Sequence, residues 1–262
     1  MELEVRNISG GYGGKRVVDC VSFRVPSGTA TTLVGANGSG KSTLLRLIAG
    51  MLPPMAGCAC LDGRDVSAIP RRELARLMGM LPQQHHAIGE LTVAELVAMG
   101  RFPHRQGWSL FASAADRRAV ETALELTRMA PLRGRTLASL SGGEGQRAWL
   151  AMTLAREPKV LLLDEPTTFL DIGKQCEFLG VVRSLIRDVQ LTVLMVLHDL
   201  NVAATFSSQL VVLKEGRVLC AGSPADTLTP TSLRTAFGVE AQVVQTSGGF
   251  PHCLVTEVVK MR

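Results

Sequence analysis

Long apolar runs are missing from this sequence of 262 residues. The longest runs, such as VLLL and LTVLMVL, fall far short of the ~18 residues that argue for a membrane-spanning helix. The opening segment, MELEVRNISG, contains acids and lacks the basic stretch and apolar core of a signal peptide. We therefore expect a protein of the cytoplasm or of the cytoplasmic face of a membrane.

A zinc-binding cysteine pattern is also missing. The six cysteines are scattered, and no second cysteine or histidine pair stands at a zinc spacing. Cys58 and Cys60 flank one residue in GCACLDG, a run typical of a strand before a turn, so their side chains are expected on one face. A metal or redox pair is one interpretation; two ordinary thiols in a reducing compartment is the favoured one.

The charge is unevenly placed. The formal net charge is +5, and charged residues make up only 19% of the chain against 46% hydrophobic residues, which predicts a buried core. Between Arg101 and Arg147 the chain carries eight arginines and four acids. Because aromatic residues are not interleaved with these arginines, a solvated helical face, or a surface meeting a partner or anionic headgroups, is favoured over a nucleic-acid face.

The order of apolar patterns predicts an α/β fold. Strand-like runs fill the first 34 residues, and VLLLDEP and TVLMVLHD are the near-continuous apolar runs of a buried parallel sheet. Between the strand-rich parts, 1–85 and 156–225, residues 86–155 have helical patterns and are interpreted as an inserted helical subdomain. The remaining residues, 226–262, predict an extension with a short helix and two strands.

Local signals predict several element ends. Thr92 with Glu95 and Ser113 with Asp116 match the capping box that begins a helix. Two hairpins are predicted, with turns at Asp62-Gly63 and Glu215-Gly216.

A phosphate-binding loop is predicted by GANGSGKST, which lies between a strand and a helix. Backbone N–H groups and the helix N-terminus would hold phosphates there. Lys41 would reach the β- and γ-phosphates, Ser42 would ligate Mg²⁺ and Thr43 would lie near the phosphates. The other residues predicted to bind the nucleotide in this loop are Gly35, Asn37, Gly38, Ser39 and Gly40.

Two carboxylates end the apolar run VLLLDEP. Asp164 is expected at the carboxyl edge of a parallel sheet, where ligands bind, and there it would serve Mg²⁺. The next residue, Glu165, points elsewhere along that edge and could polarise an attacking water.

Three further polar or aromatic residues are candidates for the same site. His198 ends another apolar strand, so contact with the γ-phosphate is favoured over a purely structural role. Gln83 follows MLP, a strand end from which it could touch Mg²⁺ or the water. Tyr12, the single tyrosine, lies among glycines in GGYGGK and could stack on an adenine.

A second helix start suited to anions lies in SLSGGEGQ. Ser141, Gly142 and Gly143 offer N–H and hydroxyl donors at this start, but no lysine accompanies them. A phosphate bound there would therefore depend on a lysine from elsewhere.

Together these motifs resemble the ATPase subunit of ABC transporters, over about residues 2–225. ELVAMGRFPHRQGW and DEPTTFLDIGKQ are similar to importers of iron–siderophore complexes, haem and vitamin B12, although other importers share much of this pattern. The resemblance implies an α/β phosphate-loop core with an N-terminal antiparallel β subdomain and an inserted helical subdomain. It implies ATP and Mg²⁺ as cofactors, with Ser42, Gln83 and Asp164 at the metal.

The resemblance also implies roles for residues and partners. Glu165 would be the general base, with His198 holding the γ-phosphate and Gln83 sensing it. The helix start with Ser141 and Glu144 would meet the ATP of a second copy in a head-to-tail homodimer, and Asp171 would cross that interface. GRFPHRQGW would lie near the permease, and a solute-binding protein would act indirectly; no nucleic acid is expected.

Two positions depart from the commonest signature, L-S-G-G-Q-x-Q. Glu144 stands at the fifth place, and Gly145 follows it, which costs up to ~1 kcal/mol of helix stability relative to Ala. We expect a slightly looser helix start with function retained. The remaining alternatives are a soluble ABC-type ATPase acting on nucleic acid or ribosomes, and a phosphate-loop kinase, which fits worse because it would lack LSGG.

Overall fold

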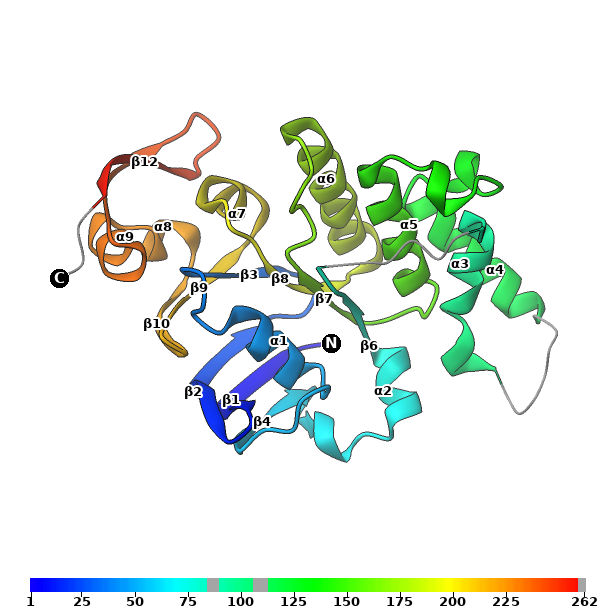
Figure 1. The fold of residues 1–262 in the computed structure, drawn as a ribbon, viewed down its shortest axis with the longest axis horizontal. Coiled ribbons are helices and arrows are strands. Elements are labelled where there is room, and N and C mark those ends of the chain that lie inside the picture. The colour runs from blue at the N-terminus through cyan, green and yellow to red at the C-terminus, as the bar shows by residue number, and fades with distance from the viewer. Residues whose placement is uncertain (84–89, 106–112, 259–262) are drawn as a thin grey trace. The chain divides into compact units, whose positions relative to one another are not determined.

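The computed structural model describes residues 1–83, 90–105 and 113–258, and the chain divides into two compact units (Figure 1). Unit 1 consists of residues 1–68 and 192–262, and unit 2 consists of residues 69–191.

Unit 1 begins with an antiparallel sheet whose strand order is β2-β1-β4-β5. Its strands are β1 (Leu3–Tyr12), β2 (Lys15–Val25), β4 (Ala56–Leu61) and β5 (Arg64–Asp65). The turn between β1 and β2 is Gly13-Gly14, with φ of 56° and 80°. Two successive positive φ angles define the tight hairpin turn that matches strand twist, so glycines suit this position. The predicted turn at Asp62-Gly63 is confirmed between β4 and β5.

The second strand set of unit 1 is β3 (Ala30–Val34), β8 (Thr192–Val196), β9 (Gln209–Lys214) and β10 (Arg217–Gly222). β3 lies parallel to both β8 and β9, and β10 pairs antiparallel with β9. Every residue of β3 and β8 is buried, as their nearly continuous apolar sequences require. Two helices of this unit follow β3 and β8, namely α1 (Lys41–Ile48) and α7 (Leu200–Phe206).

The C-terminal part of unit 1 contains the predicted short helix and two strands. Its elements are α8 (Pro224–Thr227), α9 (Pro230–Phe237), β11 (Val239–Gln245) and β12 (Pro251–Val258). Thr229 caps α9 by accepting from the N–H of Ser232, and Gly238 ends the helix with a left-handed φ of 67°. β11 and β12 form an antiparallel hairpin.

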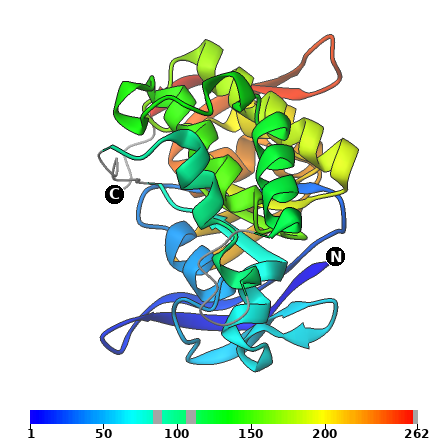
Figure 2. The ribbon, with the colours of Figure 1, turned by 90° about the vertical axis from the view of Figure 1, so that its right-hand side faces the viewer.

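Unit 2 combines two parallel strands with five α-helices among its described residues. The strands are β6 (Met78–Leu81) and β7 (Val160–Asp164). The helices are α2 (Arg71–Leu77), α3 (Val93–Met99), α4 (Ala114–Leu126), α5 (Gly142–Leu154) and α6 (Ile172–Val189). α3, α4 and α5 pack on one another, and Figure 2 shows these green helices grouped together. Both predicted capping boxes are confirmed, at Thr92 for α3 and at Ser113 for α4.

The predicted α/β class, the N-terminal antiparallel sheet and the helical segment are confirmed. The predicted domain limits at 85/86 and 155/156 remain predictions, and parts of the helical segment, 86–89 and 106–112, lie outside the described residues. The predicted contact segment GRFPHRQGW ends among these. In the described part of the chain, no helix is both long and apolar enough to cross a membrane.

The interpretation of the arginine-rich segment as solvated or partner-facing is wrong for two of its members. Arg101 and Arg147 are only 4% and 6% exposed. Each guanidinium reaches an acid of unit 2, Asp116 for Arg101 and Glu177 for Arg147. A buried arginine needs such a partner because an unpaired charge is costly away from water.

Candidate functional site

The phosphate-binding loop of unit 1 connects β3 to α1. Gly35 has a φ of 154°, and a Cβ there would overlap the carbonyl oxygen of Leu213. Gly40, the residue before α1, has a left-handed φ of 97°. Both positions therefore require glycine, which allows the loop to fold back closely over the start of α1.

The side chains of this loop leave its rim suited to an anion. Lys41 is 5% exposed, and its ammonium donates to the carbonyl oxygens of Gly35 and Ala36 at 2.8 and 3.0 Å. The hydroxyl of Ser39 is buried and has no hydrogen-bond partner among the described residues. α1 has no acid in its first turn, which contains Ser42 and Thr43, so its N-terminus keeps its positive partial charge. These features fit the phosphates of a nucleotide, with Asn37 and Gly38 exposed at the tip.

The turn of the β9–β10 hairpin forms a backbone hydrogen bond to this loop. The N–H of Gly216 donates to the carbonyl oxygen of Ser39 at 3.1 Å, and the carbonyl oxygen of Gly216 accepts from the N–H of Asp19. Arg217 also forms an ion pair with Asp19. The hairpin was predictable from its Glu215-Gly216 turn, whereas its contact with the loop joins segments that lie far apart in the sequence.

Tyr12 and His198 are the other predicted site residues of unit 1. The hydroxyl of Tyr12 accepts from Arg46 of α1 at 2.9 Å, while the ring stays 45% exposed and open to a base. His198 is exposed just beyond β8. Because β8 lies parallel to β3, His198 and the phosphate-binding loop follow adjacent strand ends at the same sheet edge.

Unit 2 places three predicted polar residues at one strand edge. Parallel pairing sets Leu81 of β6 opposite Leu163 of β7, so Gln83, Asp164 and Glu165 follow neighbouring strand ends. Asp164 is 3% exposed at the end of β7.

The side chains of Gln83 and Glu165 contact each other directly. The amide of Gln83 donates to Glu165 Oε2 at 2.6 Å, and the hydroxyl of Thr168 donates to the same oxygen at 3.3 Å. Glu165 has a left-handed φ of 51°, an unusual backbone for a non-glycine residue. Such outliers persist where the surroundings hold them, which is common at functional sites.

The predicted second helix start is confirmed as the N-terminus of α5. The Ser141 hydroxyl accepts from the N–H of Glu144, and the Glu144 carboxylate accepts from the N–H of Ser141 at 2.8 Å. This bond to the Ser141 backbone lowers the pKa of Glu144, so the carboxylate is charged at neutral pH. The N–H groups of Gly142 and Gly143 lie in the first turn, where an α-helix offers no acceptor of its own.

α6 begins beside α5. Asp171, predicted to lie at a dimer interface, caps α6 by accepting from the N–H of Lys174 at 2.9 Å and is itself exposed. Lys174 and Arg147 of α5 both pair with Glu177. Glu177 of α6 thereby connects the two helices through Arg147. Its pKa is lowered, mainly by its hydrogen bond to Lys174.

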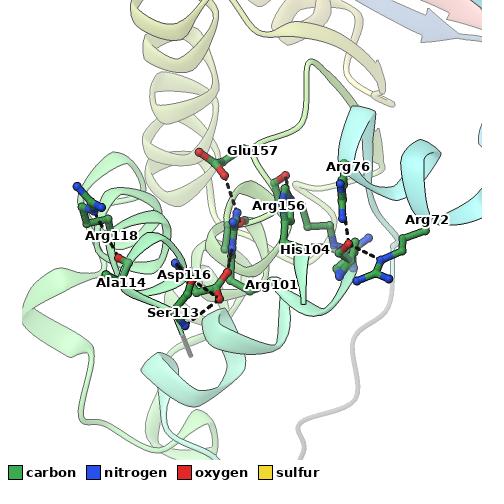
Figure 3. A network of polar contacts seen from close by, with 12 residues as sticks. Arg72, Arg76, Arg101, His104, Ser113, Ala114, Asp116, Arg118, Arg156 and Glu157 are labelled. Carbon is green, nitrogen blue, oxygen red and sulfur yellow. Dashed lines mark hydrogen bonds and ion pairs between the residues drawn. The ribbon is translucent and has the colours of Figure 1, made fainter. Parts of the chain in front are cut away.

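Arg101, which follows α3 and its cap residue Gly100, forms hydrogen bonds to three other residues of unit 2 (Figure 3). Its Nε donates to Asp116 of α4 at 2.8 Å, and its Nη1 donates to the carbonyl oxygen of Ala155 and to Glu157, both at 2.6 Å. The hydrogen bond from Arg101, followed by bonds from Ser113, lowers the pKa of Asp116 to about 2.

Metal-ligating residues do not cluster in the described parts of the chain: no three His, Cys, Asp or Glu side chains there could hold a metal together. Cys58 and Cys60 share a strand face, with their sulfur atoms 3.7 Å apart, and both are free thiols. Burial raises the pKa of the Cys60 thiol to about 11, so it stays protonated at neutral pH.

Comparison with known proteins shows close relatives over nearly the whole chain. The family model described as ABC transporter matches residues 18–168. The iron(3+)-hydroxamate import ATP-binding protein FhuC of Bacillus subtilis is 39% identical over 98% of this chain and 96% of that protein. The cobalamin import ATP-binding protein BtuD of Halobacterium salinarum is 40% identical over 93% of this chain and 60% of that protein. A solved inward-facing metal-chelate type transporter superposes with a TM-score of 0.83 and 26% identity, over 97% of both chains.

Proposed function

Because this chain belongs to the ABC transporter family and is an ATPase of that family, we propose that it powers the import of a metal chelate, such as an iron–siderophore complex or haem, or of cobalamin. The support is the similarity along almost the full chain to ATP-binding proteins named for iron-hydroxamate and cobalamin import. Import of another solute by the same machinery is the alternative.

The phosphate-binding loop would hold ATP. Lys41 would release its bonds to the loop carbonyls and contact the β- and γ-phosphates, and Ser39 would supply the hydroxyl that is buried without a partner. Ser42 and Asp164 would be ligands of Mg²⁺, with Gln83 beside them. The exposed ring of Tyr12 would stack on adenine, held in place by Arg46.

Glu165 would be the general base that accepts a proton from the attacking water. Its oxygen Oε2 is already held by Gln83 at 2.6 Å, so the amide would orient the carboxylate and report the presence of the γ-phosphate. His198 would donate to a γ-phosphate oxygen and stabilise the charge that develops there. The Gln83–Glu165 contact is the observation that carries this assignment most directly.

The start of α5 would complete the site of a second copy. It offers the hydroxyl of Ser141 and the N–H groups of Gly142 and Gly143, and its carboxylate, Glu144, is occupied in the capping box. Two copies arranged head to tail would pair Lys41 of one with Ser141 of the other. Asp171, exposed at the start of α6, would contact the facing copy.

ATP-driven closure of this dimer would be transmitted to permease subunits, with the chain at the cytoplasmic face of the membrane and a solute-binding protein delivering cargo. The test is uptake into vesicles that contain the chain co-purified with its permease. We expect ATP-dependent uptake of a ferric hydroxamate or of cobalamin by the wild type. With Glu165→Gln, we expect ATP binding to remain and uptake to stop. ATP hydrolysis stimulated by RNA and unaffected by the permease would overturn the proposal.

A further inference from the structure

A cavity of about 430 Å³ opens on unit 2, and none of its lining residues is among those assigned to ATP. α4 lines one side, and the other side is lined by the end of α5 with the segment before β7 and by Val189 and Leu191, at and just after the end of α6. Its volume lies within the ~300–1,000 Å³ typical of small-molecule sites.

The floor of the cavity is apolar. It consists of Ala119 and Ala123 of α4, Leu154 at the end of α5, and Leu191 after α6, all at most 8% exposed. The small alanines leave the space, because longer side chains at these two positions of α4 would fill it. An apolar body placed there would displace water from a surface that the chain already shields.

The rim of the cavity carries an excess of positive charge. Arg118 of α4 and Lys159, directly before β7, are both exposed there. The one acid of the rim, Glu157, is held at 2.6 Å by Arg101, and Figure 3 shows its carboxylate directed at that guanidinium. Arg118 donates from Nε to the carbonyl oxygen of Ala114 at 3.4 Å, as Figure 3 shows, and among the described residues no acid forms an ion pair with Arg118 or with Lys159.

We propose that this cavity binds a small amphipathic organic anion, with its acidic group between Arg118 and Lys159 and its apolar body on the alanine–leucine floor. Charge complementarity selects the anion, since an equivalent cation would face two like charges. The apolar floor favours a ligand with an apolar body, since a fully polar anion would leave the floor without an apolar contact. This site is separate from the proposed nucleotide contacts and extends the function beyond ATP-driven transport.

The probe for the test is anilinonaphthalene sulfonate, which combines an apolar body with one anionic group. Its fluorescence is titrated on the full-length protein first without nucleotide and then after saturating ATP and Mg²⁺ are added, and decanoate or decylammonium is added last as competitor. We expect saturable binding of one probe per chain, displacement by decanoate and none by decylammonium. Loss of the probe signal on adding ATP, or equal displacement by both competitors, would overturn the proposal.

Two variants locate the site. Lys159→Met removes one cation of the rim and should weaken binding by about tenfold or more, the usual value of a charge-assisted hydrogen bond. Thr122→Trp, at an exposed position of the lining, should block the cavity. Arg117→Met is the control, since Arg117 lies on the same helix outside the lining. Unchanged affinity in both test variants would refute the assignment.

Discussion

Replacing Arg101 by methionine should destabilise the protein strongly at neutral pH. The change keeps an unbranched side chain of similar length but removes the hydrogen bonds to Asp116, Glu157 and the carbonyl oxygen of Ala155. Arg101 is 4% exposed and Asp116 8% exposed, so the variant leaves a buried carboxylate without its cation. Breaking a buried pair in this way costs about 3–5 kcal/mol of the free energy of unfolding.

The lowered pKa of Asp116 gives a second measure of the free energy that the interactions of this carboxylate contribute to stability. A decrease from 3.8 to about 2 corresponds to ~2.5 kcal/mol, of which we expect ~1–2 kcal/mol after solvent screening. Because the folded-state pKa is lowered, this contribution is complete above about pH 4 and is lost as the pH falls through about 2. At pH 3, about half of the Asp116 contribution should be lost. The difference in the free energy of unfolding between wild type and variant should therefore be smaller at pH 3 than at pH 7 by that amount.

Urea unfolding followed by circular dichroism at pH 7 and pH 3 measures both effects. Asp116→Asn and the variant that carries both changes complete a double-mutant cycle. Because the two single changes remove the same interaction, their effects on the free energy of unfolding should be strongly non-additive. A cost below ~1 kcal/mol, or the same cost at both pH values, would refute the reasoning that Arg101 holds unit 2 together through Asp116.

Two further predictions concern α5 and the cysteines. Gly145→Ala should raise the free energy of unfolding by about 0.5–1 kcal/mol, because an added Cβ meets no atom within 4 Å. Gly100→Ala, measured beside it by urea unfolding, should destabilise instead, since its Cβ would overlap the carbonyl oxygen of Met152. Iodoacetamide at pH 8, followed by mass spectrometry, should modify Cys60 at least about tenfold more slowly than the exposed Cys176, because burial raises the pKa of Cys60 to about 11. Equal rates at the two thiols would contradict the burial of Cys60.

Local features of the fold were predictable because their causes are local. The capping boxes at Thr92 and Ser113 depend on residues three positions apart, and the hairpin turn at Asp62-Gly63 depends on two adjacent residues with positive φ. The phosphate-binding loop was predictable for the same reason, since its glycines and Lys41 act within nine consecutive residues. Long apolar runs predicted the buried strands.

Contacts between distant segments could not be predicted in this way. Arg101 meets Glu157 across 56 positions, and Gln83 meets Glu165 across 82. The sequence suggested that Gln83 and Glu165 both follow strands, but only the parallel pairing of those strands brings their side chains together. The burial of Arg101 could not be predicted, because nothing in the local sequence distinguishes a buried arginine from a solvent-exposed one.

We propose that each ATP site is shared between two copies, and a mixing experiment tests this arrangement most directly. Lys41→Ala and Ser141→Arg should each abolish ATP hydrolysis by the protein assembled with its permease. When the two variants are mixed and reassembled, half of the dimers formed at random contain one intact site, built from Lys41 of one copy and Ser141 of the other. We predict recovery to about a quarter of the wild-type rate if the sites act independently. A mixture that hydrolyses ATP no faster than the separate variants would contradict the shared site.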